Sequence, residues 1–226
     1  MSRPIVVDVD GTMSRPDRSI EGRVIDALRA WAGPVVVATG KALPYPVGLC
    51  DFVGIPVRVV AENGGVVCAE GVLEVHGNAE APRRAARRIE DAGYDLGWDP
   101  ADLVNRWRET EVAVSHDVPG AVVDDAAAAE GLEVVDSEYA YHVKSPDVSK
   151  GLALATVAAL LDLSTTDFAA IGDSANDLST FEVVGDAYAV GNAVEAAKAT
   201  ADHVTEGRYA DGLLEALSTI ADDVPA

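Results

Sequence analysis

Cysteine, lysine and long apolar runs are all scarce in this 226-residue sequence. The two cysteines, Cys50 and Cys68, provide no disulfide framework and lie in no metal-binding motif, so we expect inert thiols in a reducing compartment. No stretch approaches the ~20 consecutive apolar residues that cross a bilayer. These absences argue against a disulfide-stabilised secreted scaffold and against a membrane-spanning protein, and they favour a cytoplasmic one.

Basic residues are few as well, because 17 lysines and arginines face 38 acidic residues and the formal net charge is −21. Such a field repels nucleic acids and anionic membranes, so we expect neither as a partner. The acids are scattered along the whole chain, and the four lysines are Lys41, Lys144, Lys150 and Lys198. This distribution favours a surface adapted to high salt; the alternative is an ordinary acidic cytosolic protein.

What the sequence does contain is a hydrophobic fraction of 49%, enough for one large domain or for a domain with a second one inserted. The first forty residues predict a strand over 5–9, a helix over 20–31 and a strand over 34–38. A strand, a helix and a strand in this order form a βαβ unit and so predict a parallel sheet. Ligands of such sheets bind beyond the carboxyl ends of the strands.

The first predicted strand runs into Asp8-Val9-Asp10-Gly11-Thr12. Side chains alternate along a strand, so Asp8 and Asp10 are expected to point to the same side. Two carboxylates this close repel each other unless one is protonated or a cation lies between them, and Mg²⁺ prefers oxygen ligands. Taken alone, the pair is more simply explained as a strand end followed by a turn with solvated acids. Polar segments later in the chain favour a cation site over a plain turn.

Three later stretches place further polar groups at predicted strand or helix ends. Thr39-Gly40 follows the second strand, where a hydroxyl and glycine amides can hold a phosphate oxygen. Lys150 precedes a predicted apolar helix over 151–163. Asp173, Asn176 and Asp177 follow a predicted strand over 167–171 and form a second group of oxygen ligands; the alternative role for Asp173 is to cap the next helix.

The middle of the chain differs in composition from both ends. A hairpin is predicted over 66–69 and 72–76, followed by an amphipathic helix over 80–93. A strand over 111–116, a helix over 119–130 and a strand pair over 132–137 and 139–144 come next. We therefore predict a small α+β domain at 80–148, inserted into an α/β domain made of 1–79 and 149–226. The α/β domain ends with a last short strand over 188–190, a helix carrying Lys198 and a terminal helix within 207–221.

Four segments thus bring a carboxylate pair, a hydroxyl with a glycine, a lysine and a second acidic group to one sheet edge. Phosphoryl transfer through an acyl-phosphate needs all four. A carboxylate that attacks a phosphate dianion requires neutralising charge, which Mg²⁺ and a lysine can supply. A second carboxylate can protonate the leaving alcohol and then activate water.

Four of these segments resemble the signature motifs of the haloacid dehalogenase (HAD) superfamily: DVDGT at 8–12, VATG at 37–40, Lys150 and GDSAND at 172–177. ENGG at 62–65 and the position of the inserted domain are similar to the Cof-like branch with a C2B cap. The short cap and the chain length are most similar to archaeal phosphoglycolate phosphatases. The resemblance implies a doubly wound, Rossmann-like α/β core with an inserted α+β cap.

The resemblance also implies a role for each motif residue. Asp8 would be the nucleophile and a metal ligand, and Asp10 the acid/base that binds the metal through its backbone carbonyl. The implied remaining roles are phosphoryl binding by Thr39, Gly40 and Lys150, Mg²⁺ binding by Asp173 with Asp177 in the same acidic group, and support by Asn176.

The substrate implied by the resemblance is 2-phosphoglycolate, a small metabolite, handled by a monomer or homodimer. One alternative is a sugar-phosphate phosphatase of the sucrose-phosphate or mannosyl-3-phosphoglycerate type. Another, from a different class, is a phospho-accepting receiver domain, which the chain length and the D-x-D-G-T order oppose. Arg106, Arg108, His142 and Lys144 are candidates to bind a substrate carboxylate, with packing or solvation as the alternative. Trp98, Trp107 and Tyr139 are expected in the core of the cap.

Overall fold

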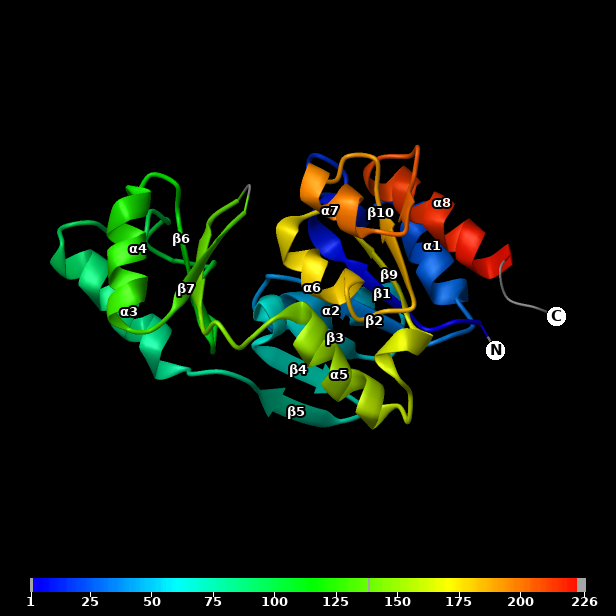
Figure 1. Cartoon of the computed structure of the whole chain (residues 1–226), viewed down its shortest axis with the longest axis horizontal. Helices are drawn as coiled ribbons and strands as arrows, with labels where there is room; N and C mark the ends of the chain where they lie inside the picture. The colour runs from blue at the N-terminus through cyan, green and yellow to red at the C-terminus, as the bar shows by residue number, and fades with distance from the viewer. Residues whose placement is uncertain (1, 138, 223–226) are drawn as a thin grey trace.

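The computed structural model describes residues 2–137 and 139–222, and its main sheet has eight strands in the order β11-β10-β9-β1-β2-β3-β4-β5 (Figure 1). The six strands from β11 to β3 pair in parallel, and β4 and β5 complete the sheet as an antiparallel hairpin. The strands are β1 (Ile5–Asp8), β2 (Val35–Ala38), β3 (Arg58–Ala61), β4 (Val66–Ala69), β5 (Val72–Val75), β9 (Ala169–Gly172), β10 (Asp186–Ala189) and β11 (His203–Val204).

Helices cover both faces of this sheet, so its central strands are buried on both sides. Val7 of β1 packs in one core with α1, α2 and α8, whereas its neighbour Val6 packs in another core with α5, α6 and α7. The helices are α1 (Gly22–Ala30), α2 (Pro44–Val53), α5 (Lys150–Leu160), α6 (Leu178–Phe181), α7 (Glu195–Thr200) and α8 (Tyr209–Asp222). Short helical turns are η1 (Val9–Met13), η2 (Glu62–Gly64), η3 (Thr165–Asp167) and η4 (Ala175–Asp177). This arrangement confirms the predicted doubly wound α/β fold.

A second, antiparallel sheet of three strands has the order β6-β8-β7 and lies beside the main sheet (Figure 1). Its strands and the two helices packed on it are β6 (Glu111–Val114), β7 (Glu133–Asp136), β8 (Tyr141–Lys144), α3 (Glu80–Asp91) and α4 (Gly120–Ala129). Alanine, valine and isoleucine side chains of both helices and of β6 and β8 form a separate hydrophobic core. All of these elements fall within 80–148, the range predicted for the inserted cap; the domain boundaries themselves stay a prediction.

The strand order places the predicted site segments next to one another. β1 lies between β9 and β2, and all three run parallel, so their carboxyl ends meet at one edge of the sheet. Asp8 ends β1, Thr39 follows β2 and Asp173 follows β9. The convergence expected from the βαβ pattern is therefore present.

The structure adds two elements that the sequence pattern did not predict. Helix α2 begins at Pro44, and its prolines obscured it, although proline is well tolerated in the first turn of a helix. Strand β11 continues the sheet beyond β10, so 188–190 does not hold the last strand.

The expectation that Trp107 and Tyr139 lie in the cap core was wrong, since 43% and 38% of their surfaces are exposed. Within the described residues, no helix is long and apolar enough to cross a membrane.

Candidate active site

The site begins where β1 ends. Asp8 is the last residue of β1 and is buried, and the chain then turns sharply through η1. Gly11 has a φ of +86°, and a Cβ atom on it would lie 2.1 Å from Oδ2 of Asp173, so only glycine fits there. Because β1 ends at Asp8, strand alternation does not govern Asp10, and the expectation that Asp8 and Asp10 point to the same side stays a prediction.

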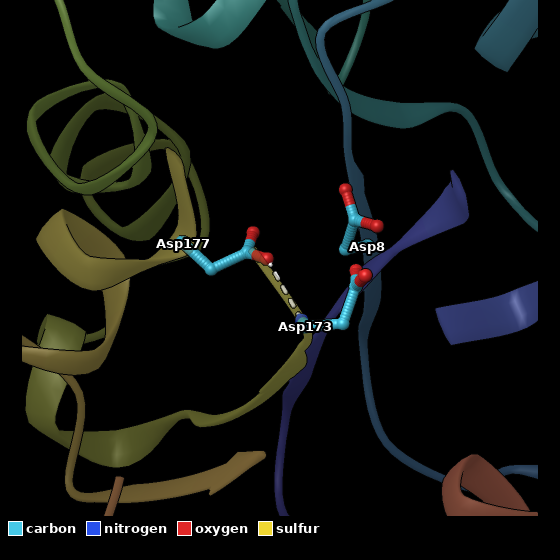
Figure 2. A group of neighbouring side chains, drawn as sticks. All are labelled: Asp8, Asp173 and Asp177. Atoms are coloured by element: carbon cyan, nitrogen blue, oxygen red, sulfur yellow. Dashed lines mark hydrogen bonds between the residues drawn. The ribbon is translucent and has the colours of Figure 1, made fainter. Parts of the chain in front are cut away.

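A second turn, after β9, supplies the other two carboxylates. Gly172 allows the close approach of Asp177, whose Oδ2 accepts hydrogen bonds from the backbone N–H groups of Asp173 (3.0 Å) and Ser174 (3.1 Å). The Thr12 hydroxyl donates to Oδ1 of Asp173 at 3.1 Å. Asp8, Asp173 and Asp177 each offer one oxygen within 4.8 Å of the others, and Figure 2 shows the three carboxyl groups converging.

Lys150, the first residue of α5, reaches this cluster from a helix that packs on the same face of the sheet as Val6. Its Nζ donates to Oδ1 of Asp8 and Oδ1 of Asp177, both at 2.7 Å, and to Oδ1 of Asn176 at 3.0 Å. Burial alone would lower the pKa of this ammonium, but the charges of Asp177 and Asp8 hold that pKa above its usual value. Lys150 therefore stays protonated inside the site.

The cluster carries more negative charge than one lysine can balance. Burial raises the pKa of Asp8 well above its usual value, and although the Lys150 charge opposes this shift, the charges of Asp177 and Asp173 add to it. Burial, together with the charge of Asp177, raises the pKa of Asp173 to about 7. Oδ2 of Asp8 is buried and has no hydrogen-bond partner among the described residues. An unpartnered carboxylate oxygen beside two further carboxylates fits a hard divalent cation.

Asp10 lies apart from the three converging carboxylates. Its Oδ2 pairs with Nζ of Lys41 at 2.8 Å, and 45% of the side chain is exposed. The Asp10 carboxylate therefore lies outside the cluster, although Asp10 belongs to η1, the turn directly after β1. This position is open to a substrate, as a proton-transfer group must be.

Thr39 and Gly40 form the turn after β2. The buried Thr39 hydroxyl accepts a hydrogen bond from the Lys41 amide at 3.2 Å, which leaves its own hydrogen to donate. The Gly40 carbonyl accepts from Nη1 of Arg108 at 2.8 Å, so this turn contacts the segment that leads into β6. A Cβ atom on Gly40 would approach the Asn63 side chain to 3.1 Å.

A chain of hydrogen bonds that sequence reasoning missed joins Lys150 to the second sheet. Asn176 accepts from Lys150 and donates to Oδ1 of Asn63 at 2.9 Å, and Asn63 donates to Oε2 of Glu111 at 2.8 Å. A cation thus stands at one end, a carboxylate at the other, and the two amides between them point the same way. ENGG at 62–65 follows a strand end, which was the available signal for Asn63; nothing local marks Glu111, which is 48 residues away.

A parallel contact holds the same segment to the main sheet. The carboxylate of Glu62, fully buried, accepts from the backbone N–H groups of Glu109 and Thr110 and from the Thr110 hydroxyl at 2.8–3.0 Å. Glu62 and Asn63 both have positive φ values, 51° and 54°, which set their side chains toward this segment. ENGG therefore acts as a docking point for the chain entering β6.

Three of the four cap residues proposed to bind a substrate carboxylate have partners inside the protein. Glu111 pairs with Arg108 and accepts from Nδ1 of His142 at 3.1 Å, and burial lowers the pKa of His142 to about 3, so its ring is neutral. Lys144 pairs with Glu133 and donates to the Val148 carbonyl. Arg106 is exposed. A direct role for any of the four in substrate binding stays a prediction.

Comparison with known proteins agrees with this geometry. The profile of the haloacid dehalogenase-like hydrolases matches residues 126–217. A phosphoglycolate phosphatase from Halobacterium salinarum is 56% identical over 217 residues, 96% of each chain. Another from Natronomonas pharaonis is 51% identical and covers 99% of this chain and 100% of its own. The chain belongs to the haloacid dehalogenase superfamily.

Two solved structures share the fold. The crystal structure of protein 0175 from Thermoplasma acidophilum superposes with a TM-score of 0.84 at 25% identity. The match covers 97% of this chain and 98% of that one. A haloacid dehalogenase-like hydrolase from Bacteroides thetaiotaomicron gives a TM-score of 0.74 at 18% identity, covering 97% and 100%. This haloacid dehalogenase superfamily member is an enzyme, a phosphatase, and its acidic composition fits its halophilic archaeal relatives.

Proposed function

We propose that this phosphatase hydrolyses 2-phosphoglycolate to glycolate and phosphate, with Mg²⁺ and through an aspartyl-phosphate on Asp8. The observation that carries the mechanism is the state of the Asp8 carboxylate. One oxygen is bound by Lys150, and the other is buried without a partner among the described residues, beside two more carboxylates. The substrate is inferred from relatives named for phosphoglycolate that match almost the whole chain.

The metal ligands would be Oδ2 of Asp8, the carboxylate of Asp173 and the backbone carbonyl of Asp10. Asp177 would belong to the same acidic group, but both of its oxygens already accept hydrogen bonds, so it would orient Asp173 and Lys150. Bound Mg²⁺ would supply Lewis-acid stabilisation of the phosphoryl oxygens and offset the excess negative charge.

In the first step, an oxygen of Asp8 forms a bond to phosphorus while the bond from phosphorus to the glycolate oxygen breaks. Asp10 gives its proton to that leaving oxygen, from its open position beside the cluster. The Lys150 ammonium offsets the charge of the transferring group, and the Thr39 hydroxyl with the Gly40 turn holds phosphoryl oxygens. Asn176 keeps Lys150 in place.

In the second step, Asp10, now ionised, takes a proton from a water molecule that attacks phosphorus. The bond from phosphorus to the Asp8 oxygen breaks, phosphate leaves, and Asp10 is protonated again. Atoms and protons therefore balance over the cycle, and both steps use the same two aspartates. The contacts of Glu62 and Glu111 hold the second sheet against the site.

The decisive experiment measures phosphate release from 2-phosphoglycolate by purified wild-type protein, Asp8→Asn and Asp26→Asn, with Mg²⁺ and with EDTA. Asp8→Asn should lose activity by at least about 10⁴-fold, because it removes the nucleophile. Asp26, 80% exposed on α1, provides the same substitution away from the site and should leave activity unchanged. EDTA should abolish wild-type activity and excess Mg²⁺ should restore it.

Three results would contradict the proposal. Near-normal turnover by Asp8→Asn would contradict the assignment of Asp8 as the nucleophile. Turnover without a metal would contradict the role of Mg²⁺. A wild-type protein that turns over sucrose phosphate or mannosyl-3-phosphoglycerate faster than 2-phosphoglycolate would replace the substrate. Acid-quenched wild-type enzyme should carry a phosphoryl group that hydroxylamine releases, and Asp8→Asn should carry none.

A further inference from the structure

A cavity of about 170 Å³ opens next to the site, between the segment after β1 and the start of α2. Asp10 and Thr39, which follow the carboxyl ends of β1 and β2, line it, and Arg18 and Lys41 add two cations. Ile20 and Leu49 contribute apolar wall. None of Arg18, Lys41 or the wall residues has a part in the mechanism proposed above.

The location of the cavity follows from the roles of two of its lining residues. Thr39 is proposed to hold a phosphoryl oxygen, and Asp10 is proposed to protonate the oxygen that leaves. The cavity therefore starts where the leaving group is attached, and the rest of the leaving group extends into it. At about 170 Å³ it is smaller than the roughly 300–1,000 Å³ of sites for drug-sized ligands, so it suits a small leaving group better than a disaccharide.

The charge of the cavity selects the chemical class of that group. Lys41 uses one of its three N–H donors on Oδ2 of Asp10 at 2.8 Å, and 34% of its side chain is exposed. Arg18 lies with its guanidinium carbon 4.5 Å from the centre of the Tyr139 ring, a contact that leaves the N–H groups at the guanidinium edge to donate. Two cations and one acid line a cavity in a chain that has 38 acids and 17 bases.

We propose that Lys41 and Arg18 bind the carboxylate of the leaving group, so that the cavity selects phosphomonoesters of small acids. This inference rests on the proposed function and names the residues that read its substrate. Tyr139 comes from the turn between β7 and β8, so the second sheet contributes by fixing Arg18 rather than by contacting the carboxylate. Charge-assisted hydrogen bonds to a carboxylate discriminate strongly against a neutral analogue, because the cations then lose an anionic partner.

The test compares two substrates that differ only at the group in question: 2-phosphoglycolate and 2-hydroxyethyl phosphate, in which a CH₂OH group replaces the carboxylate. The quantity measured is the ratio of kcat/KM for the acid to kcat/KM for the alcohol. Because Lys41 also contacts Asp10, Lys41→Gln is expected to slow both substrates, and the ratio cancels that shared effect.

We expect wild-type protein to favour the acid and Lys41→Gln to lower the ratio by at least about tenfold. Arg18→Gln should lower it by about threefold or more, and Lys41→Arg, which keeps the charge, should retain most of the preference. Lys198→Gln is the matched control, since Lys198 lies on α7 and pairs with Glu195 at 3.3 Å. Its ratio should stay within about twofold of wild type.

The outcomes separate this inference from the proposed function. A ratio in Lys41→Gln equal to that in Lys198→Gln, with 2-phosphoglycolate still hydrolysed, overturns the carboxylate site and leaves the function standing. A wild-type enzyme that ignores 2-phosphoglycolate but prefers 3-phosphoglycerate to glycerol 1-phosphate, with loss of that preference in Lys41→Gln, corrects the substrate and supports the site. A wild-type enzyme without preference for the acid in either pair overturns the inference.

Discussion

Replacing Glu111 by glutamine should destabilise the protein and slow it at the same time. The Glu111 side chain is fully buried and has three donors around it: Arg108, Nδ2 of Asn63 at 2.8 Å and Nδ1 of His142 at 3.1 Å. A glutamine of the same shape has one acceptor oxygen and one NH₂ group. Whichever way it turns, its NH₂ group meets Arg108 or Asn63, and two donors face each other.

The hydrogen-bond chain to the site cannot adjust to this change. Asn63 would have to turn its amide round to accept from the glutamine, but its oxygen already accepts from Asn176. Asn176 cannot turn either, because Lys150 donates to it and an ammonium has no acceptor. Arg108 keeps the carbonyls of Gly40 and Val104 as acceptors. The loss of unfolding free energy in Glu111→Gln should therefore lie toward the lower end of the range for a broken buried ion pair.

We expect Glu111→Gln to lose about 3 kcal/mol of unfolding free energy, which corresponds to a fall in Tm of roughly 6–12 °C for a chain of this size. The value of kcat should fall several-fold with little change in KM, because Lys150 is held less firmly while substrate contacts remain. Urea unfolding and steady-state kinetics at molar KCl measure both quantities.

The matched control is Glu80→Gln, the same substitution in an exposed pair with Arg83, where the two side chains are 65% and 48% exposed. It should change stability by no more than about 0.5 kcal/mol. The reasoning is refuted if Glu111→Gln unfolds within about 1 kcal/mol of wild type, or if it is destabilised without any change in kcat.

Two further predictions concern charge. Because the pKa of Asp173 rises from 3.8 to about 7 on folding, native metal-free protein keeps a proton on Asp173 that the unfolded chain has lost, so the contribution of Asp173 to stability should fall between pH 4 and 7 and level off above. Urea unfolding with EDTA at several pH values should show a steeper fall for wild type than for Asp173→Asn, and equal slopes would count against the shift. The net charge of −21 should make Tm rise from low salt to molar KCl through screening, whereas a flat or falling Tm would argue against adaptation to high salt.

Local sequence patterns specified the elements that hold the site. The short apolar run at 5–9, the apolar spacing over 20–31 and the turn residues after each strand predicted parallel strands ending in polar groups. Because parallel strands end at the same edge of a sheet, the meeting of Asp8 and Asp173 followed from the sequence. Lys150 was placed at this edge because it begins a predicted apolar helix and because the motif resemblance supported it; periodicity alone does not place it in the site.

Local patterns failed where geometry over a few residues or over long separations decided the outcome. Asp10 departs from the strand rule because the chain leaves β1 at Asp8, and α2 was hidden by prolines that fit a helix start. Tyr139 looked like a core residue, yet its ring contacts Arg18, more than a hundred positions away.

The sequence by itself thus determined the α/β fold, the sheet edge and the aspartates that gather there, because these depend on side-chain periodicity and on turns of a few residues. Only the tertiary structure decided which oxygen of Asp8 lacks a partner within the described part of the chain, that Lys41 pairs with Asp10, and that Glu111 is linked to Lys150 through two amides. Those contacts join residues from different elements. Which group donates and which accepts in each hydrogen bond depends on the relative placement of the two sheets, which no local pattern encodes.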